Sequence, residues 1–142
     1  MPAPYWPQTA LLHDHMDGSY PLLTILPKLA RLSGAEYPFD QWARHHEQVI
    51  NWFGNPLKGD IIEKFSITTG VMQKVDTLFL AAKTYTQIRA NQGFKYCEAI
   101  IAPQYHTFAG LPIQEVIHSL VRGIMRAEKD NPGIEVNLLL GV

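Results

Sequence analysis

His13 and His15 are the residues of this sequence whose types and spacing point most directly to chemistry. They stand two positions apart, directly after the short apolar run 9–12, which we expect to form a buried strand. Successive side chains of a strand point to opposite faces, so the two imidazoles share a face and Asp14 points the other way. Two imidazoles at that spacing can bind one metal ion such as Zn2+, with Zn–N distances of about 2.0–2.1 Å.

A His-x-His pair alone is a weak signal, because it occurs often by chance. Here it follows an apolar strand near the N-terminus and precedes Asp17-Gly18, a pair that favours a turn. It also lies at the carboxyl end of its strand, where parallel α/β folds place their active sites. Asp17 comes after the strand, and we expect its carboxylate to reach back over the metal pocket.

The elements that must position this pair can be predicted from the hydrophobic spacing. Helical spacing is found in five segments. Apolar runs bounded by Gly or Pro predict two further strands. The expected helices are 20–33, 39–52, 60–68, 77–93 and 113–130, and the expected further strands are 94–101 and 134–140. Helices between successive strands imply parallel pairing through crossovers.

Composition bounds the class of protein. The chain has 142 residues, with 12 basic against 13 acidic side chains, so its charge makes no case for nucleic acid or an anionic membrane as partner. No apolar stretch approaches the roughly 18 residues that span a bilayer, and the N-terminus lacks the features of a signal peptide. A lone cysteine, Cys97, lies in an apolar run and reads as a buried, inert thiol rather than a nucleophile. We therefore expect a soluble, cytoplasmic protein.

Other polar residues are weaker candidates. Glu98 lies within the second expected strand and is either a partner of a histidine ligand or a structural carboxylate. His106 follows that strand, and we expect it to be exposed on a loop. The adjacent pair 45–46 points about 100° apart on a helix and suits one metal poorly. His118 lies on a helix and is expected to face solvent or packing.

The run from Leu12 to Ser19 resembles the opening motif of the adenosine deaminase family, His-x-His-Leu-Asp-Gly at the end of strand one. The similarity continues in linked blocks at consistent spacing and is weakest between 35 and 59. The matching residues are Phe65, Thr69–Gln73, Ala81-Ala82, Gly93, Tyr96, Glu98, Pro103, His106, Gly110-Leu111, Glu115-Val116 and Arg122-Gly123. The chain departs from the family pattern at Tyr20-Pro21 and at Ala99-Ile100.

This resemblance implies a fold. The family forms a (β/α)8 TIM barrel, so residues 1–142 would be the N-terminal fragment of a single amidohydrolase-type barrel domain, about three β/α units long. Residues 35–76 would be a helical insert after strand one, over the active-site face. The family's further metal ligands and its catalytic glutamate would lie beyond Val142. No catalytic residue is therefore assigned within this chain, and we expect the chain alone to be inactive.

The resemblance also implies a reaction, the zinc-dependent hydrolytic deamination of adenosine or a related purine nucleoside to the inosine-type product. His13 and His15 would bind the one Zn2+ of the active site. Asp17 would bind the ribose 5′-hydroxyl; related adenine deaminases, whose substrate has no ribose, usually carry Glu-Gly there. An apolar helix would close over the substrate, and its contacts would come from Ile61, Ile62 and Phe65.

Two alternatives stay open at the level of sequence. Another metal-dependent amidohydrolase, acting on an amide, a ring or a phosphoester, would carry the same histidine pair, although the block Thr69–Gln73 favours the deaminase branch. A truncated, non-catalytic relative could act as a binding or assembly protein. An open three-stranded parallel sheet leaves an exposed edge, so we expect the partner there to be the rest of the barrel, or a second copy associating across the sheet edge.

Overall fold

The structure, a computed structural model, describes residues 10–34 and 46–142. At its centre lies a parallel sheet whose three strands follow each other in space in the order β1-β2-β3. The strands are β1 (Ala10–His15), β2 (Tyr96–Ile101) and β3 (Glu135–Leu140). Spatial order and chain order agree, as they do in successive β/α units of a barrel.

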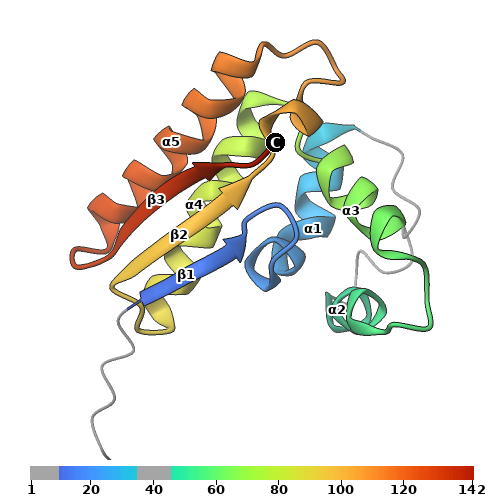
Figure 1. Ribbon diagram of the computed structural model, residues 1–142, viewed down its shortest axis with the longest axis horizontal. Coiled ribbons are helices and arrows are strands. Elements are labelled where there is room, and N and C mark those ends of the chain that lie inside the picture. The colour runs from blue at the N-terminus through green and yellow to red at the C-terminus, as the bar shows by residue number, and fades with distance from the viewer. Residues whose placement is uncertain (1–9, 35–45) are drawn as a thin grey trace, which may run out of the picture.

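Five α-helices and one short 3-10 helix connect these strands within the described residues. They are α1 (Tyr20–Ser33), α2 (His46–Gly54), α3 (Ile61–Gly70), α4 (Val75–Asn91), the 3-10 helix η2 (Pro103–His106) and α5 (Ile113–Asp130). The first four α-helices lie between β1 and β2, while η2 and α5 lie between β2 and β3 (Figure 1). None of the helices in the described ranges is long and apolar enough to cross a membrane.

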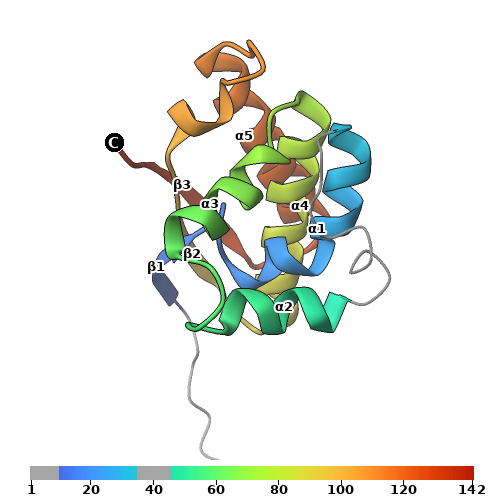
Figure 2. The same ribbon diagram turned by 90° about the vertical axis from the view of Figure 1, so that its right-hand side faces the viewer.

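Helices cover one face of the sheet. α4 and α5 pack behind it, and Figure 2 shows the strands on one side of the molecule with these helices on the other. The alternation along β2 agrees, because Cys97, Ala99 and Ile101 are buried while the residues between them are only half-buried. No helix of the described segments covers the second face, which is the face that closes inward in a barrel.

The α4–α5 contact depends on Gly123. A Cβ at this position would lie 2.4 Å from the carbonyl oxygen of Phe79 and 2.9 Å from the Cβ of Ala82. The hydrophobic spacing of the segment 113–130 predicts one apolar stripe that includes Ile113, Val121 and Met125, but on α5 these three side chains are exposed. That part of the prediction was wrong because small residues share the interface, namely Ser119, Gly123 and Ala127.

The helix α1 has the bounds that the sequence predicted. It ends at Gly34, whose φ of 67° is left-handed, a conformation that glycine adopts without steric cost. Its buried side, which includes Leu22, Leu26 and Leu29, belongs to the same core as the buried side of α4.

Two helices, α2 and α3, lie wholly within the described part of the segment 35–76, and α4 begins at its end. The carboxylate of Asp60 caps α3 by accepting a hydrogen bond from the backbone N–H of Glu63 at 2.7 Å. Residues 35–45 lie outside the described residues, so the first part of the helix expected at 39–52, and His45 with it, is not placed. The role of this segment as an insert over the active-site face stays a prediction.

Candidate active site

A β-bulge shapes the carboxyl end of β1. Leu11 pairs with Cys97 and Asp14 pairs with Ala99, so two residues of β1 oppose the single residue Glu98 of β2. A bulge twists its strand locally and re-aims the side chains that follow. Here it turns Asp14 toward the helices, on the same side as the buried Ala99.

The rings of His13 and His15 lie next to each other on the side away from Asp14. Their centroids are 5.3 Å apart, the ring planes meet at 66°, and both residues are exposed. This arrangement fits two imidazole ligands of one zinc ion. The described segments contain no group of three or more His, Cys, Asp or Glu placed to hold a metal. Catalytic zinc sites have three protein donors and an open position, so these two rings alone do not make up such a ligand set.

Asp14 fixes this strand end to α4. Its Oδ2 atom accepts hydrogen bonds from the Tyr85 hydroxyl at 2.8 Å and from Nη2 of Arg89 at 2.6 Å. The ion pair is largely buried, with side chains only 11% and 15% exposed. Burial, followed by the hydrogen bond to Asp14, raises the pKa of Tyr85, so its hydroxyl stays protonated and keeps donating.

Asp17 faces His106. The Nε2 atom of His106 lies 3.3 Å from Asp17 Oδ2, its Nδ1 atom lies 3.0 Å from the carbonyl oxygen of Met72, and both side chains are buried. Within the described part of the chain, the Oδ1 atom of Asp17 is buried without a hydrogen-bond partner. The expectation that His106 is exposed on a loop was wrong, because η2 folds its ring inward under the loop that follows β1. Its place in a block that matches the family was the sequence signal for a role.

Backbone and side-chain amides hold these loops together. The N–H of Met16 donates to the carbonyl oxygen of Ile100 at 2.9 Å, which fixes the loop after β1 to the end of β2. The side chain of Gln73 donates to the carbonyl oxygen of Tyr105 at 2.7 Å and accepts from the N–H of Phe108 at 2.8 Å. The segment after α3 is thereby fixed to the segment after β2.

Of the three predicted substrate-contact residues of α3, Ile61 and Ile62 are exposed and Phe65 is half-buried. Ile61 is 83% exposed and Ile62 is 73% exposed. Phe65 packs edge to face against Tyr105, which packs in the same way against Phe108.

Two residues of β2 take structural positions. Cys97 is fully buried, as predicted, and burial raises the pKa of its thiol to about 11. Such a thiol is a poor nucleophile at neutral pH. Glu98 accepts a hydrogen bond from the Tyr96 hydroxyl at 2.9 Å, which matches the structural one of the two roles that the sequence left open.

Solved structures of similar shape identify the class of the fold. The chain is similar to an adenine deaminase from Arthrobacter aurescens, with a TM-score of 0.71 and 22% identity over 95% of this chain and 39% of that one. It is also similar to an amidohydrolase from Burkholderia ambifaria with bound zinc, with a TM-score of 0.70 and 18% identity over 93% of this chain and 35% of that one. The fold is thus α/β, and its parallel three-stranded sheet corresponds to part of a TIM barrel.

Sequence comparison identifies the family. The family model described as adenosine deaminase matches residues 7–142. The adenosine deaminase of Mycobacteroides abscessus is 32% identical over 84% of this chain and 33% of its own length, and adenosine deaminase 1 of Streptomyces coelicolor is 32% identical over 84% and 30%. The chain belongs to the adenosine deaminase family, and it spans about a third of the length of these curated relatives.

Proposed function

We propose that the full-length protein carrying these residues is a zinc-dependent deaminase that hydrolyses adenosine, or a related purine nucleoside, to the inosine-type product and ammonia. One observation carries this proposal. In a chain of the adenosine deaminase family, the rings of His13 and His15 lie 5.3 Å apart at the carboxyl end of β1. This is the end of the sheet at which barrel enzymes carry out their chemistry.

The donor set of the two imidazoles fits zinc. His13 and His15 would hold the ion together with ligands from outside this segment, and the similar amidohydrolase from Burkholderia ambifaria was solved with bound zinc. When bound, zinc lowers the pKa of a coordinated water so that hydroxide is available at neutral pH. Asp14, which is held by Arg89 of α4, would support the pair from the helical side of the sheet.

The chain's other residues would bind and cover the nucleoside. The Oδ1 atom of Asp17, which has no partner among the described residues, would accept a hydrogen bond from the ribose 5′-hydroxyl. The apolar surface of α3, with Ile61, Ile62 and Phe65, would close over the purine and exclude water. The segment 35–76 would then act as the cover of the site, in a cytoplasmic protein whose substrate is a small molecule.

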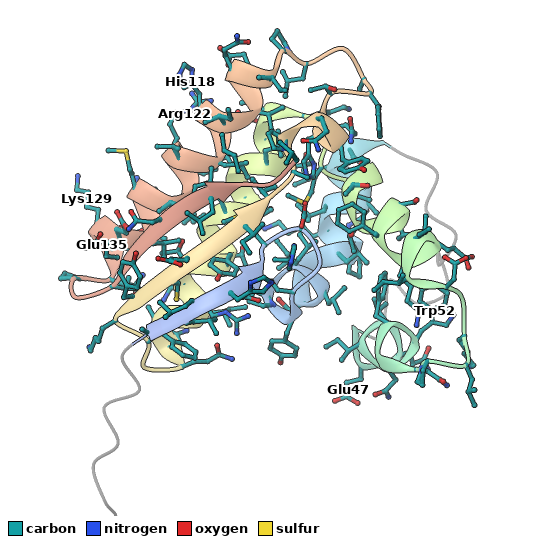
Figure 3. The ribbon with its side chains drawn as sticks, in the orientation of Figure 1. Glu47, Trp52, His118, Arg122, Lys129 and Glu135 are labelled. Carbon is teal, nitrogen blue, oxygen red and sulfur yellow. The ribbon has the colours of Figure 1, made fainter. Side chains whose placement is uncertain are left out.

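Turnover by the full-length protein tests the proposal. We expect ammonia release from adenosine by the wild type, with about one zinc per chain, and turnover lower by about three orders of magnitude or more in His13→Ala and His15→Ala. His118→Ala is the matched control, because His118 lies on the outer side of α5 (Figure 3) with a side chain 69% exposed. Full activity in His13→Ala, or hydrolysis of adenine in preference to adenosine, would contradict the proposal.

A further inference from the structure

The buried ring of His106 is hydrogen-bonded on both of its sides. The carbonyl oxygen of Met72 can only accept, so the Nδ1 atom that faces it carries a proton. On the other side of the ring, the Nε2 atom faces the carboxylate oxygen Oδ2 of Asp17 at 3.3 Å. With both contacts formed, the ring cannot turn without losing one of them.

Three segments meet at this ring. Asp17 comes from the loop after β1, Met72 comes from the segment that follows α3, and His106 itself ends η2. The segment after α3 and the segment around His106 are also joined by Gln73, whose side chain hydrogen-bonds to the backbone on either side of His106. His106 therefore connects the helix that would cover the substrate with the carboxylate that would bind it.

Only one of the two carboxylate oxygens of Asp17 has a hydrogen-bond partner among the described residues. Its Oδ2 atom is engaged by His106, while its Oδ1 atom is buried and without a partner in the described part of the structure. A buried acceptor without a donor is costly, and such groups in folded proteins call for an explanation. Under the proposed function, the explanation is a donor that arrives with the substrate.

We propose that His106 is a positioning residue, which holds the carboxylate of Asp17 with one oxygen engaged and the other free to accept a hydroxyl of the substrate. This inference rests on the proposed function and assigns a role to a residue outside the metal and substrate contacts named above. His106 does not itself touch the substrate. Its effect should therefore appear in how strongly the enzyme prefers a substrate that carries the hydroxyl.

Two amide variants of His106 in the full-length protein separate its two contacts. In His106→Gln the amide nitrogen can reach the place of Nε2 and can still donate to Asp17. In His106→Asn the shorter side chain places its amide nitrogen near the position that Nδ1 has in the wild type. From there the amide can donate to the carbonyl oxygen of Met72, but it does not reach Asp17. Both variants carry a side-chain amide, and each keeps one of the two hydrogen bonds of His106.

The measurement is the ratio of kcat/KM for adenosine to kcat/KM for 5′-deoxyadenosine, which lacks the hydroxyl. In His106→Asn the carboxylate of Asp17 is no longer held in place to accept the 5′-hydroxyl. We expect this ratio to fall by about tenfold or more, because the hydrogen bond between that hydroxyl and a charged group is lost. We expect His106→Gln to keep it within about threefold of the wild-type value. Zinc content and the thermal midpoint, measured on the same samples, report on folding.

The outcomes are distinct. A fall in turnover of both nucleosides by the same factor in His106→Asn, with an unchanged ratio, would show a merely structural role and overturn the inference alone. If His106→Asn does not fold, His106→Gln decides: a wild-type ratio supports the inference and a collapsed ratio overturns it. A wild-type protein that turns over neither nucleoside would overturn the proposed function, and the inference with it.

Discussion

Arg89 donates to Asp14 from behind the strand end that carries both histidines. Its Nε and Nη2 atoms lie 3.0 Å and 2.6 Å from the same oxygen, Asp14 Oδ2, which also accepts from Tyr85. All of these donors come from α4. The backbone between His13 and His15 is therefore fixed on the helical side, and the two imidazoles are left on the open side of the sheet.

The Asp14–Arg89 pair should matter strongly for stability. We expect Arg89→Gln in the full-length protein to lower the free energy of unfolding by about 3 kcal/mol, because it leaves a largely buried carboxylate without its cation. The matched control is Arg122→Gln, since Arg122 lies exposed on the outer side of α5 (Figure 3), and its change should stay within about 0.5 kcal/mol. Urea unfolding of the metal-free protein measures both, and equal effects would contradict the role of the pair.

The close contact between α4 and α5 at Gly123 predicts that two glycine-to-alanine variants differ in stability. Gly123→Ala should destabilise the protein by about 2 kcal/mol, because the new methyl group must displace backbone at Phe79. Gly70→Ala adds the same methyl group at the end of α3, where no atom lies within 4 Å, and should change stability by less than about 1 kcal/mol. Thermal unfolding tests this, and a Gly123→Ala protein as stable as the wild type would show that the helices are not in close contact there.

Most of the secondary structure could be predicted because its signals are local. The helix at 20–33 has a clear apolar spacing and a glycine at its end, and both bounds are confirmed. The face of α5 could not be predicted in the same way. The hydrophobic spacing predicts that Val121 and Met125 are buried, but both are exposed. The close approach of α4 instead favours small side chains on α5. That requirement comes from tertiary packing and is not visible in the sequence of one helix.

The exposed isoleucines of α3 should act on substrate binding rather than on stability. We expect Ile62→Ser to lower kcat/KM for adenosine by about tenfold, because an apolar contact formed on closure is lost, while the free energy of unfolding stays unchanged. Leu32→Ser, at a half-exposed leucine of α1, serves as the control and should leave kcat/KM unchanged. An unaltered kcat/KM in Ile62→Ser would remove α3 from the substrate site.

The buried thiol of Cys97 should make the free energy of unfolding decrease at alkaline pH. Burial raises the pKa of its thiol from 9.0 to about 11, so the folded state keeps a proton that the unfolded chain releases. The resulting stabilisation is fully present below pH 9 and is lost as the pH rises toward 11, an effect of about 2–3 kcal/mol. Urea unfolding at a series of pH values measures it. The slope should be smaller in Cys97→Val, whose side chain does not titrate, and an equal slope would assign the effect to other groups such as Tyr85.

The candidate site was only partly accessible from sequence. The spacing of His13 and His15 predicted adjacent rings correctly, because strand alternation is a local rule and the bulge leaves it intact at these residues. The burial of His106 depends on contacts with Asp17 and Met72, which are distant in the chain. A histidine on a connecting segment has no periodicity from which such burial could be predicted.

A zinc-edge anomalous difference map from crystals of the full-length protein tests most directly whether His13 and His15 bind one metal ion. We expect a single strong peak at about 2.0–2.1 Å from one nitrogen of each ring. A protein that deaminates adenosine while its map shows no metal at these two rings would contradict the assignment of the pair as zinc ligands.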